Sequence, residues 1–173
     1  MSLAPSRSLF LLAFMAGALT LGASFYLEYE AFLLPCFLCL VQQAVLATFT
    51  LINLIATIHG PKRSGIYLYW SASMGCAVLG AVTAIRQVLL QNVPLDEVPD
   101  CLPSLQNMME NLSLWQSLKL SLQGTVECVE INWTLFDLSL PEWSLLFFVA
   151  MLILGAAQFS RLLRSHRFEL MKH

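Results

Sequence analysis

The chain has 173 residues, of which 58% are hydrophobic and 12% are charged, and its formal net charge is −2 at pH 7. Soluble domains carry about 25% charged residues, so this composition excludes an ordinary soluble protein. A helix needs about 20 apolar residues to cross about 30 Å of hydrocarbon. Four segments are that long, which predicts an all-α membrane protein: one domain over residues 1–173, with a four-helix transmembrane bundle spanning about 9–27, 37–58, 66–89 and 143–163.

The first apolar segment, 9–27, follows Arg7 and resembles a signal peptide at first sight. It is longer than a usual signal-peptide core, and no small-residue cleavage site of the A-x-A type follows it. We therefore expect it to be retained as a true span. The outer loop after it, about 28–36, is short and acidic.

The second span opens with Pro35-Cys36-Phe37-Leu38-Cys39. Proline is favoured at the first position of a helix, where its missing N–H would be unpaired in any residue. Cys36 and Cys39 are then expected in the first turn, three positions apart and on nearly one face. The inner loop after this span is a polar turn with a helix breaker at each end, Gly60 and Gly65.

The third span contains Cys76 within a row of small residues, Gly75 to Ala84, which suits close helix packing. The long outer loop, about 90–142, begins with a proline-rich acidic stretch that we expect to be extended. Within it, 104–123 has apolar residues at helical spacing, with Ser104 as a candidate N-cap and Gly124 as a stop. This short helix either lies in the headgroup plane, the interpretation we favour, or packs on the bundle.

Basic residues indicate the orientation of the spans. Seven of the nine lie on the side of the two termini: Arg7, Lys62, Arg63, Arg161, Arg164, Arg167 and Lys172. Because cytoplasmic loops are rich in Lys and Arg, both termini are expected in the cytoplasm. Cys36, Cys39, Cys101 and Cys128 then lie on the outer side, where disulfides persist. The bilayer is the expected environment, and no nucleic-acid partner is expected.

A Cys-x-x-Cys pair is compatible with half a zinc site, a structural disulfide or a redox pair. Structural zinc usually needs two close pairs, whereas Cys101 and Cys128 stand 27 positions apart, so we expect no metal. A structural disulfide between Cys36 and Cys39 would close too small a loop to contribute much stability. A redox pair is favoured, because unpaired N–H groups at a helix N-terminus stabilise a thiolate.

Four outer cysteines permit three pairings, and we expect the local ones, Cys36–Cys39 and Cys101–Cys128. The second disulfide is either a plain loop staple or a site that an incoming thiolate attacks. An electron relay also needs a terminal acceptor. The chain has no G-x-G-x-x-G, and its three histidines, at 59, 166 and 173, lie on the inner side, which leaves a membrane quinone.

Together these features resemble the DsbB family of disulfide-bond oxidases of the bacterial inner membrane. The resemblance covers nearly the whole chain, namely the four spans and the order and spacing of the cysteines. It extends to local sequence in three places: Pro35-Cys-x-x-Cys39, Glu127-Cys128 with Trp133, and Pro141-Glu142-Trp143.

The resemblance implies a mechanism. A reduced thioredoxin-like partner of the DsbA type would attack Cys101 and release Cys128. Cys128 would then attack Cys36, and the freed Cys39 thiolate would pass electrons to bound quinone, either ubiquinone or menaquinone. The protein would be a dithiol:quinone oxidoreductase of the inner membrane.

One residue departs from the family pattern. An arginine commonly stands four positions after the second cysteine, close to the quinone, and here that position is Gln43. Glutamine can donate a hydrogen bond to a quinone oxygen but cannot stabilise a thiolate by charge. We expect the helix N-terminus to carry more of that task, or Arg86 at the outer end of the third span to assist. The alternative for Arg86 is an interfacial arginine that snorkels.

Two other functions compete with this one. An enzyme of the vitamin K epoxide reductase type also joins a four-helix bundle, a Cys-x-x-Cys pair and a quinone, but in that family the loop cysteines precede the active pair. The second is a non-enzymatic tetraspan subunit whose outer loop is stapled by a disulfide.

Overall fold

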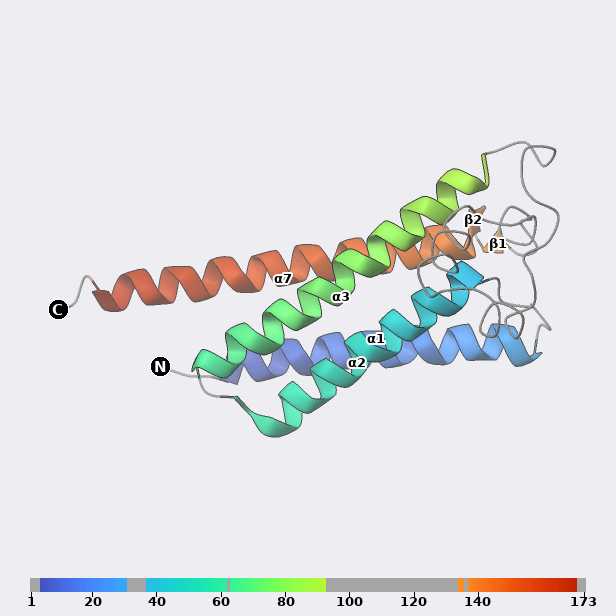
Figure 1. The fold of residues 1–173 in the computed structure, drawn as a ribbon. Helices are drawn as coiled ribbons and strands as arrows, with labels where there is room; N and C mark the ends of the chain where they lie inside the picture. The colour runs from blue at the N-terminus through green and yellow to red at the C-terminus, as the bar shows by residue number, and fades with distance from the viewer. Residues whose placement is uncertain (1–3, 31–36, 62, 93–133, 136, 171–173) are drawn as a thin grey trace, which may run out of the picture.

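The structure is a computed structural model that describes residues 4–30, 37–61, 63–92, 134–135 and 137–170. Its four long helices run along a common direction (Figure 1): α1 Ala4–Glu30, α2 Phe37–His59, α3 Arg63–Leu90 and α7 Leu140–Leu170. Each is long and apolar enough to cross a membrane. The predicted four-helix membrane bundle is therefore confirmed, and the chain is a multi-pass membrane protein.

The two ends of the bundle differ in what they hold. The N-terminus, the C-terminus and the α2–α3 connection lie at one end, which we call the terminal end (Figure 1). The start of α2, with Cys39 in its first turn, lies at the opposite end together with the end of α3 and the start of α7. We call this the cysteine end.

The α2–α3 connection is shorter than the sequence suggested. Gly60 ends α2 in a left-handed conformation, with φ of 57°, and its N–H donates to the Ala56 carbonyl at 3.1 Å. Only glycine adopts this conformation without steric cost. Gly65 does not break the chain, because α3 already begins at Arg63. A Cβ on Gly65 would lie 2.8 Å from the Pro61 Cβ, so this glycine instead permits a close approach.

Helix α7 begins at Leu140, three residues before the predicted span, because its first turn is capped. The Ser139 N–H donates to Glu142 Oε2 at 2.6 Å, and the Ser139 hydroxyl donates to the same atom at 2.9 Å. This is the capping arrangement of a Ser-x-x-Glu sequence. A two-stranded antiparallel hairpin that the sequence did not predict precedes it, formed by β1 Thr134–Leu135 and β2 Leu138–Ser139.

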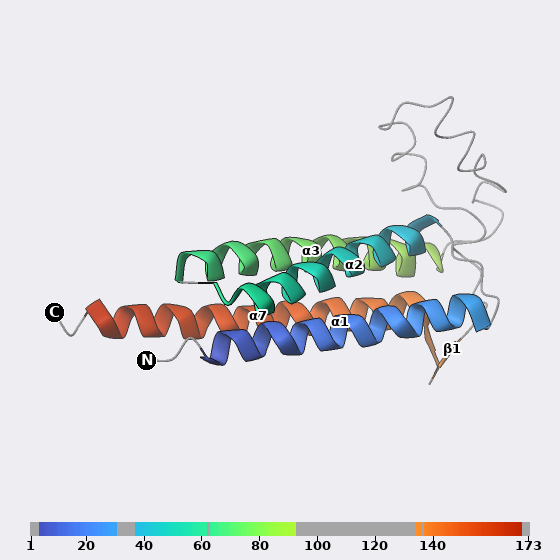
Figure 2. The same cartoon turned by 90° about the horizontal axis from the view of Figure 1, so that it is seen from below.

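The helices pack in chain order, α1 on α2, α2 on α3 and α3 on α7, whereas α1 and α7 make few contacts. Figure 2 shows the same bundle turned by 90°, with α2 and α3 on one side and α1 and α7 on the other. The main core cluster comes from the middle of α2, α3 and α7: Leu46, Phe49, Ala77, Ala81, Phe148 and Met151. A smaller cluster of Phe10, Ala56 and Ile66 lies at the terminal end.

Helices α3 and α7 approach closely through two glycines. Gly80 of α3 leaves room for the ring of Phe148, and Gly155 of α7 leaves room for the Met74 side chain; a Cβ at either glycine would collide with its neighbour. Cys76 lies on α3 in the same region, half-buried against the main core. The small-residue row of the third span therefore serves helix packing, as its sequence predicted.

Candidate functional site

The structure describes three of the residues predicted for the site, Cys39, Gln43 and Arg86. Cys36, Cys101 and Cys128 lie outside the described residues, so the pairings Cys36–Cys39 and Cys101–Cys128 stay predictions. The helix predicted over 104–123 also lies outside the described residues.

Cys39 is the third residue of α2 and is half-buried at the cysteine end. The first turn of a helix has backbone N–H groups without partners in the helix, and the macrodipole places positive potential there. The position expected from the sequence is therefore confirmed, and it favours negative charge on the sulfur.

A side chain from a second helix contacts this sulfur. Nε2 of Gln87, in the last turn of α3, donates a hydrogen bond to Cys39 Sγ at 3.1 Å. Nε2 of Gln42 on α2 donates in turn to Gln87 Oε1 at 2.7 Å. Gln42 and Gln87 are 6% and 4% exposed, which matters because a buried amide is costly unless it is hydrogen-bonded. The two glutamines thus form a buried amide pair that ends on the sulfur.

Gln43 takes part in a separate cluster with α1. Its Nε2 donates to the Ser24 hydroxyl oxygen at 3.0 Å and to Glu28 Oε2 at 3.1 Å. A glutamine amide has two N–H donors, and these two bonds use both. A hydrogen bond from Gln43 to another acceptor would therefore have to replace one of them, whereas the Ser24 hydroxyl can still donate.

Arg86 is half-buried on α3, directly before Gln87. Adjacent residues of an α-helix point about 100° apart, so the two side chains leave the helix in different directions. On α3, Gln87 donates a hydrogen bond to the Cys39 sulfur. A role for Arg86 near a bound quinone stays a proposal.

Comparison with known proteins decides the family. The family model for disulfide bond formation protein DsbB matches residues 6–158. This chain belongs to the DsbB family. It is 49% identical to "Disulfide bond formation protein B 2" of Pseudomonas fluorescens strain Pf0-1, over 93% of this chain and 88% of that one. It is 45% identical to "Disulfide bond formation protein B" of Stutzerimonas stutzeri strain A1501, over 93% of this chain and 99% of that one.

A third relative, "Disulfide bond formation protein B 1" of Pseudomonas aeruginosa strain PAO1, is 46% identical over 93% of this chain and 99% of its own length. Membership of the DsbB family indicates a redox role in disulfide formation. The buried amide pair of Gln42 and Gln87 therefore ends on a sulfur of a redox protein.

Four of these polar residues were not singled out from the sequence: Ser24, Glu28, Gln42 and Gln87. One signal was available for Gln42, since it follows Cys39 by three positions and shares its helix face. The only sequence signal for Gln87 was that it is a polar residue within an apolar span. Its contact with Cys39 joins residues 48 positions apart, and depends on how α2 and α3 are rotated against each other.

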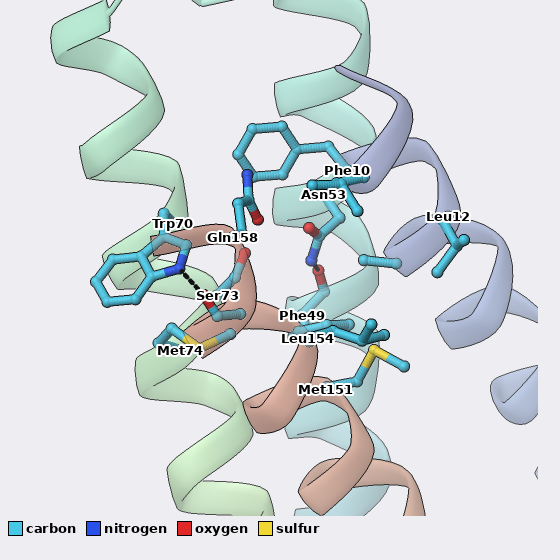
Figure 3. Close-up of a pocket in the computed structure, with 13 residues that line it drawn as sticks. Phe10, Leu12, Phe49, Asn53, Trp70, Ser73, Met74, Met151, Leu154 and Gln158 are labelled. Atoms are coloured by element: carbon cyan, nitrogen blue, oxygen red, sulfur yellow. Dashed lines mark hydrogen bonds between the residues drawn. The ribbon is translucent and has the colours of Figure 1, made fainter. Parts of the chain in front are cut away.

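A small cavity lies in the terminal half, far along the bundle from Cys39 (Figure 3). Its polar lining includes Asn53, Ser73 and Gln158 from three helices, with Phe10 and Trp70 beside them. Its water-accessible volume of about 30 Å³ accommodates about two water molecules and is too small for a quinone ring. Within the described part of the chain, Ser73 Oγ and Gln158 Nε2 have no hydrogen-bond partner. The cavity is therefore not a candidate for the redox site.

Proposed function

We propose that this DsbB-family protein is a membrane thiol oxidase that reoxidises a DsbA-type dithiol and passes the electrons to a membrane quinone. The observation that carries the proposal is the environment of Cys39. Its sulfur lies in the first turn of α2, at the end of a membrane bundle, and accepts a hydrogen bond from a buried amide. A sulfur in this position is suited to be a leaving group and an electron donor at the edge of the lipid.

The relay consists of thiol–disulfide exchanges that conserve electrons. A thiolate of the reduced partner attacks Cys101, a new S–S bond forms, and Cys128 leaves as a thiolate. The second partner thiolate then displaces Cys101, which completes the partner's disulfide. Cys128 attacks Cys36 and releases Cys39. Cys101 then attacks Cys128, which re-forms the Cys101–Cys128 disulfide and releases Cys36, so that two electrons have moved from the partner to the Cys36–Cys39 pair.

A quinone, as the second substrate, takes up these two electrons with two protons. Cys39, Gln43 and Arg86 are the residues proposed to contact it. The chemistry of the neighbouring residues fits such a molecule, because the Ser24 hydroxyl can donate to a ring oxygen. The aromatic side chains of Phe25, Tyr26 and Tyr29 on the same helix are 42%, 65% and 71% exposed, which suits contact with lipid and a lipid-soluble ring.

The proposed location is the bacterial inner membrane, with both termini in the cytoplasm. The seven basic residues counted in the sequence belong to the terminal end or to its flanking segments, where the positive-inside rule expects them. The cysteine end then faces the periplasm, in which disulfides form and persist. A periplasmic partner reaches this end without crossing the bilayer.

Trapping a mixed disulfide tests the first step of the relay, the attack of the partner on Cys101. A DsbA-type partner that lacks its resolving cysteine should form a mixed disulfide with the purified protein, visible as a shifted band on a non-reducing gel. The complex should map to Cys101 by mass spectrometry and be lost in Cys101→Ser. Cys76→Ala is the matched control and should still trap the partner. A complex that persists in Cys101→Ser would contradict the relay.

A further inference from the structure

Resting on the proposed function, we infer that Gln87 is a catalytic residue that stabilises the Cys39 thiolate as it forms, and that Gln42 is the positioning residue that orients the Gln87 amide. Gln87 contacts the reacting sulfur itself, with 3.1 Å between Nε2 and Sγ. Gln42 acts only through Gln87, with 2.7 Å between its Nε2 and Gln87 Oε1.

The orientation of the two amides determines what the sulfur meets. With Gln42 donating to Gln87 Oε1, the nitrogen side of Gln87 faces Cys39 and offers an N–H to negative charge. If both amides were reversed, Gln87 would present an oxygen, which accepts from a thiol and repels a thiolate. The two orientations therefore predict opposite effects of removing Gln87.

Burial strengthens the effect of this contact. Gln42 on α2 and Gln87 on α3 are both more than nine-tenths buried. Water competes little for the N–H groups there, so a hydrogen bond to a charged atom is stronger than at a surface. Gln43, by contrast, is uncharged and its two N–H groups bond Ser24 and Glu28. Charge stabilisation at the sulfur is thus assigned to the helix N-terminus and Gln87.

The step at which Gln87 acts is the attack of Cys128 on Cys36. The Cys128–Cys36 bond forms, the Cys36–Cys39 bond breaks, and the electron pair of the broken bond moves to the Cys39 sulfur. No proton transfer is needed, because the attacking and leaving sulfurs are both thiolates. Negative charge therefore appears on the atom to which the Gln87 amide donates.

The test measures the Cys39 thiolate without quinone or partner. In a full-length Cys36→Ser background in detergent, the rate of Cys39 alkylation by iodoacetamide is followed by mass spectrometry. It is measured at neutral pH and at about pH 10, above the ordinary cysteine pKa of about 8.5. Gln87→Met removes the donor at similar volume. Gln158→Met is the matched control, because it removes a buried glutamine amide at the other end of the bundle.

We expect the ratio of the neutral to the alkaline rate to fall about tenfold in Gln87→Met, as a lost hydrogen bond to a charged group predicts. It should stay unchanged in Gln158→Met. Gln87→Glu, which keeps the shape, should lower the ratio at least as much and serves if Gln87→Met does not fold. A merely structural role for Gln87 would leave the ratio unchanged in both variants, and a rise in the ratio would show the reversed amide orientation; either result overturns the inference.

This readout separates the inference from the proposed function. If the ratio falls but the wild-type protein reduces no quinone, Gln87 stabilises the thiolate and the proposed function is wrong. If the wild-type protein turns over and the ratio does not fall, the proposed function stands and the role of Gln87 is wrong.

Discussion

The two ends of the bundle use buried polar side chains differently. At the cysteine end, Gln42 and Gln87 bond to each other across α2 and α3, and the pair ends on a sulfur. In the terminal half, Ser73 and Gln158 are also buried, yet Ser73 Oγ and Gln158 Nε2 have no hydrogen-bond partner within the described residues. The terminal half also has hydrogen bonds between helices, such as Trp70 Nε1 donating to the Gly155 carbonyl at 2.9 Å. The cysteine end differs because its buried hydrogen-bonded pair ends on a sulfur.

The largest loss of activity should come from replacing Cys39, and the other half-buried cysteine, Cys76, provides the control. Cys39→Ser removes the proposed electron donor, and quinone reduction should fall by at least about a thousandfold, the scale on which loss of a nucleophile acts. Cys76→Ala touches only the packed core of α3 and should keep turnover close to wild type. Both rates are measured from quinone absorbance. Equal rates in the two variants would show that Cys39 is not the electron donor.

Phe148→Ala should break the scaffold and leave the chemistry in place. The ring is 1% exposed and fills the space over Gly80, so its removal should cost about 3–5 kcal/mol of unfolding free energy. Thermal unfolding in detergent measures the loss. Turnover per folded molecule should change little. A loss of turnover without a loss of stability would show that the packed core contributes directly to the chemistry at the cysteine end.

Gln42→Met sharpens the comparison within the cysteine end. Without Gln42 the Gln87 amide is free to rotate, so its N–H faces Cys39 for only part of the time. We expect oxidation of the partner's thiols to slow severalfold. The loss should be smaller than in Gln87→Met, because the Gln87 amide, which donates to the sulfur, remains. Single-turnover rates at one quinone concentration give the order, and a larger loss in Gln42→Met than in Gln87→Met would show that Gln42 acts by another route.

The smallest effect is expected at the start of α7. Glu142→Ala removes the carboxylate that accepts hydrogen bonds from Ser139 at the start of α7. A lost N-terminal cap costs about 1 kcal/mol of unfolding free energy. Chemical unfolding followed by circular dichroism measures this, with Glu142→Gln as the control that retains an acceptor. A stability unchanged in Glu142→Ala would show that the cap does not hold the helix end.

Local sequence predicted the four helices and the position of Cys39 correctly, whereas the start of α7 and the role of Gly65 were predicted wrongly. Apolar length located the four helices, and the proline and cysteine pattern placed Cys39 in the first turn of α2. The early start of α7 was also readable, since Ser139 and Glu142 form a capping sequence, but the apolar run beginning at Trp143 drew the boundary later. Gly65 was misassigned because a glycine that permits close approach looks the same in sequence as a helix breaker.

Contacts between helices could not be predicted in the same way. The Gln42–Gln87 bond joins residues 45 positions apart, and the Gln43–Glu28 bond joins α2 to α1. Each depends on the rotation of one helix against another, which the packing of Gly80 and Phe148 helps to fix elsewhere in the bundle. The sequence placed Gln42 on the helix face of Cys39 and Gln43 at the family's arginine position, but it did not show which side chains of other helices these residues bond.

The ratio of partner disulfide formed to quinone reduced is the decisive test of the proposed relay. Purified full-length protein in detergent is mixed with excess reduced DsbA-type partner and ubiquinone under nitrogen, and both products are counted. We expect one quinone to be reduced for each partner disulfide formed, with both reactions stopping when quinone runs out. Partner oxidation that continues without quinone, or quinone that stays oxidised while the partner is consumed, would contradict it.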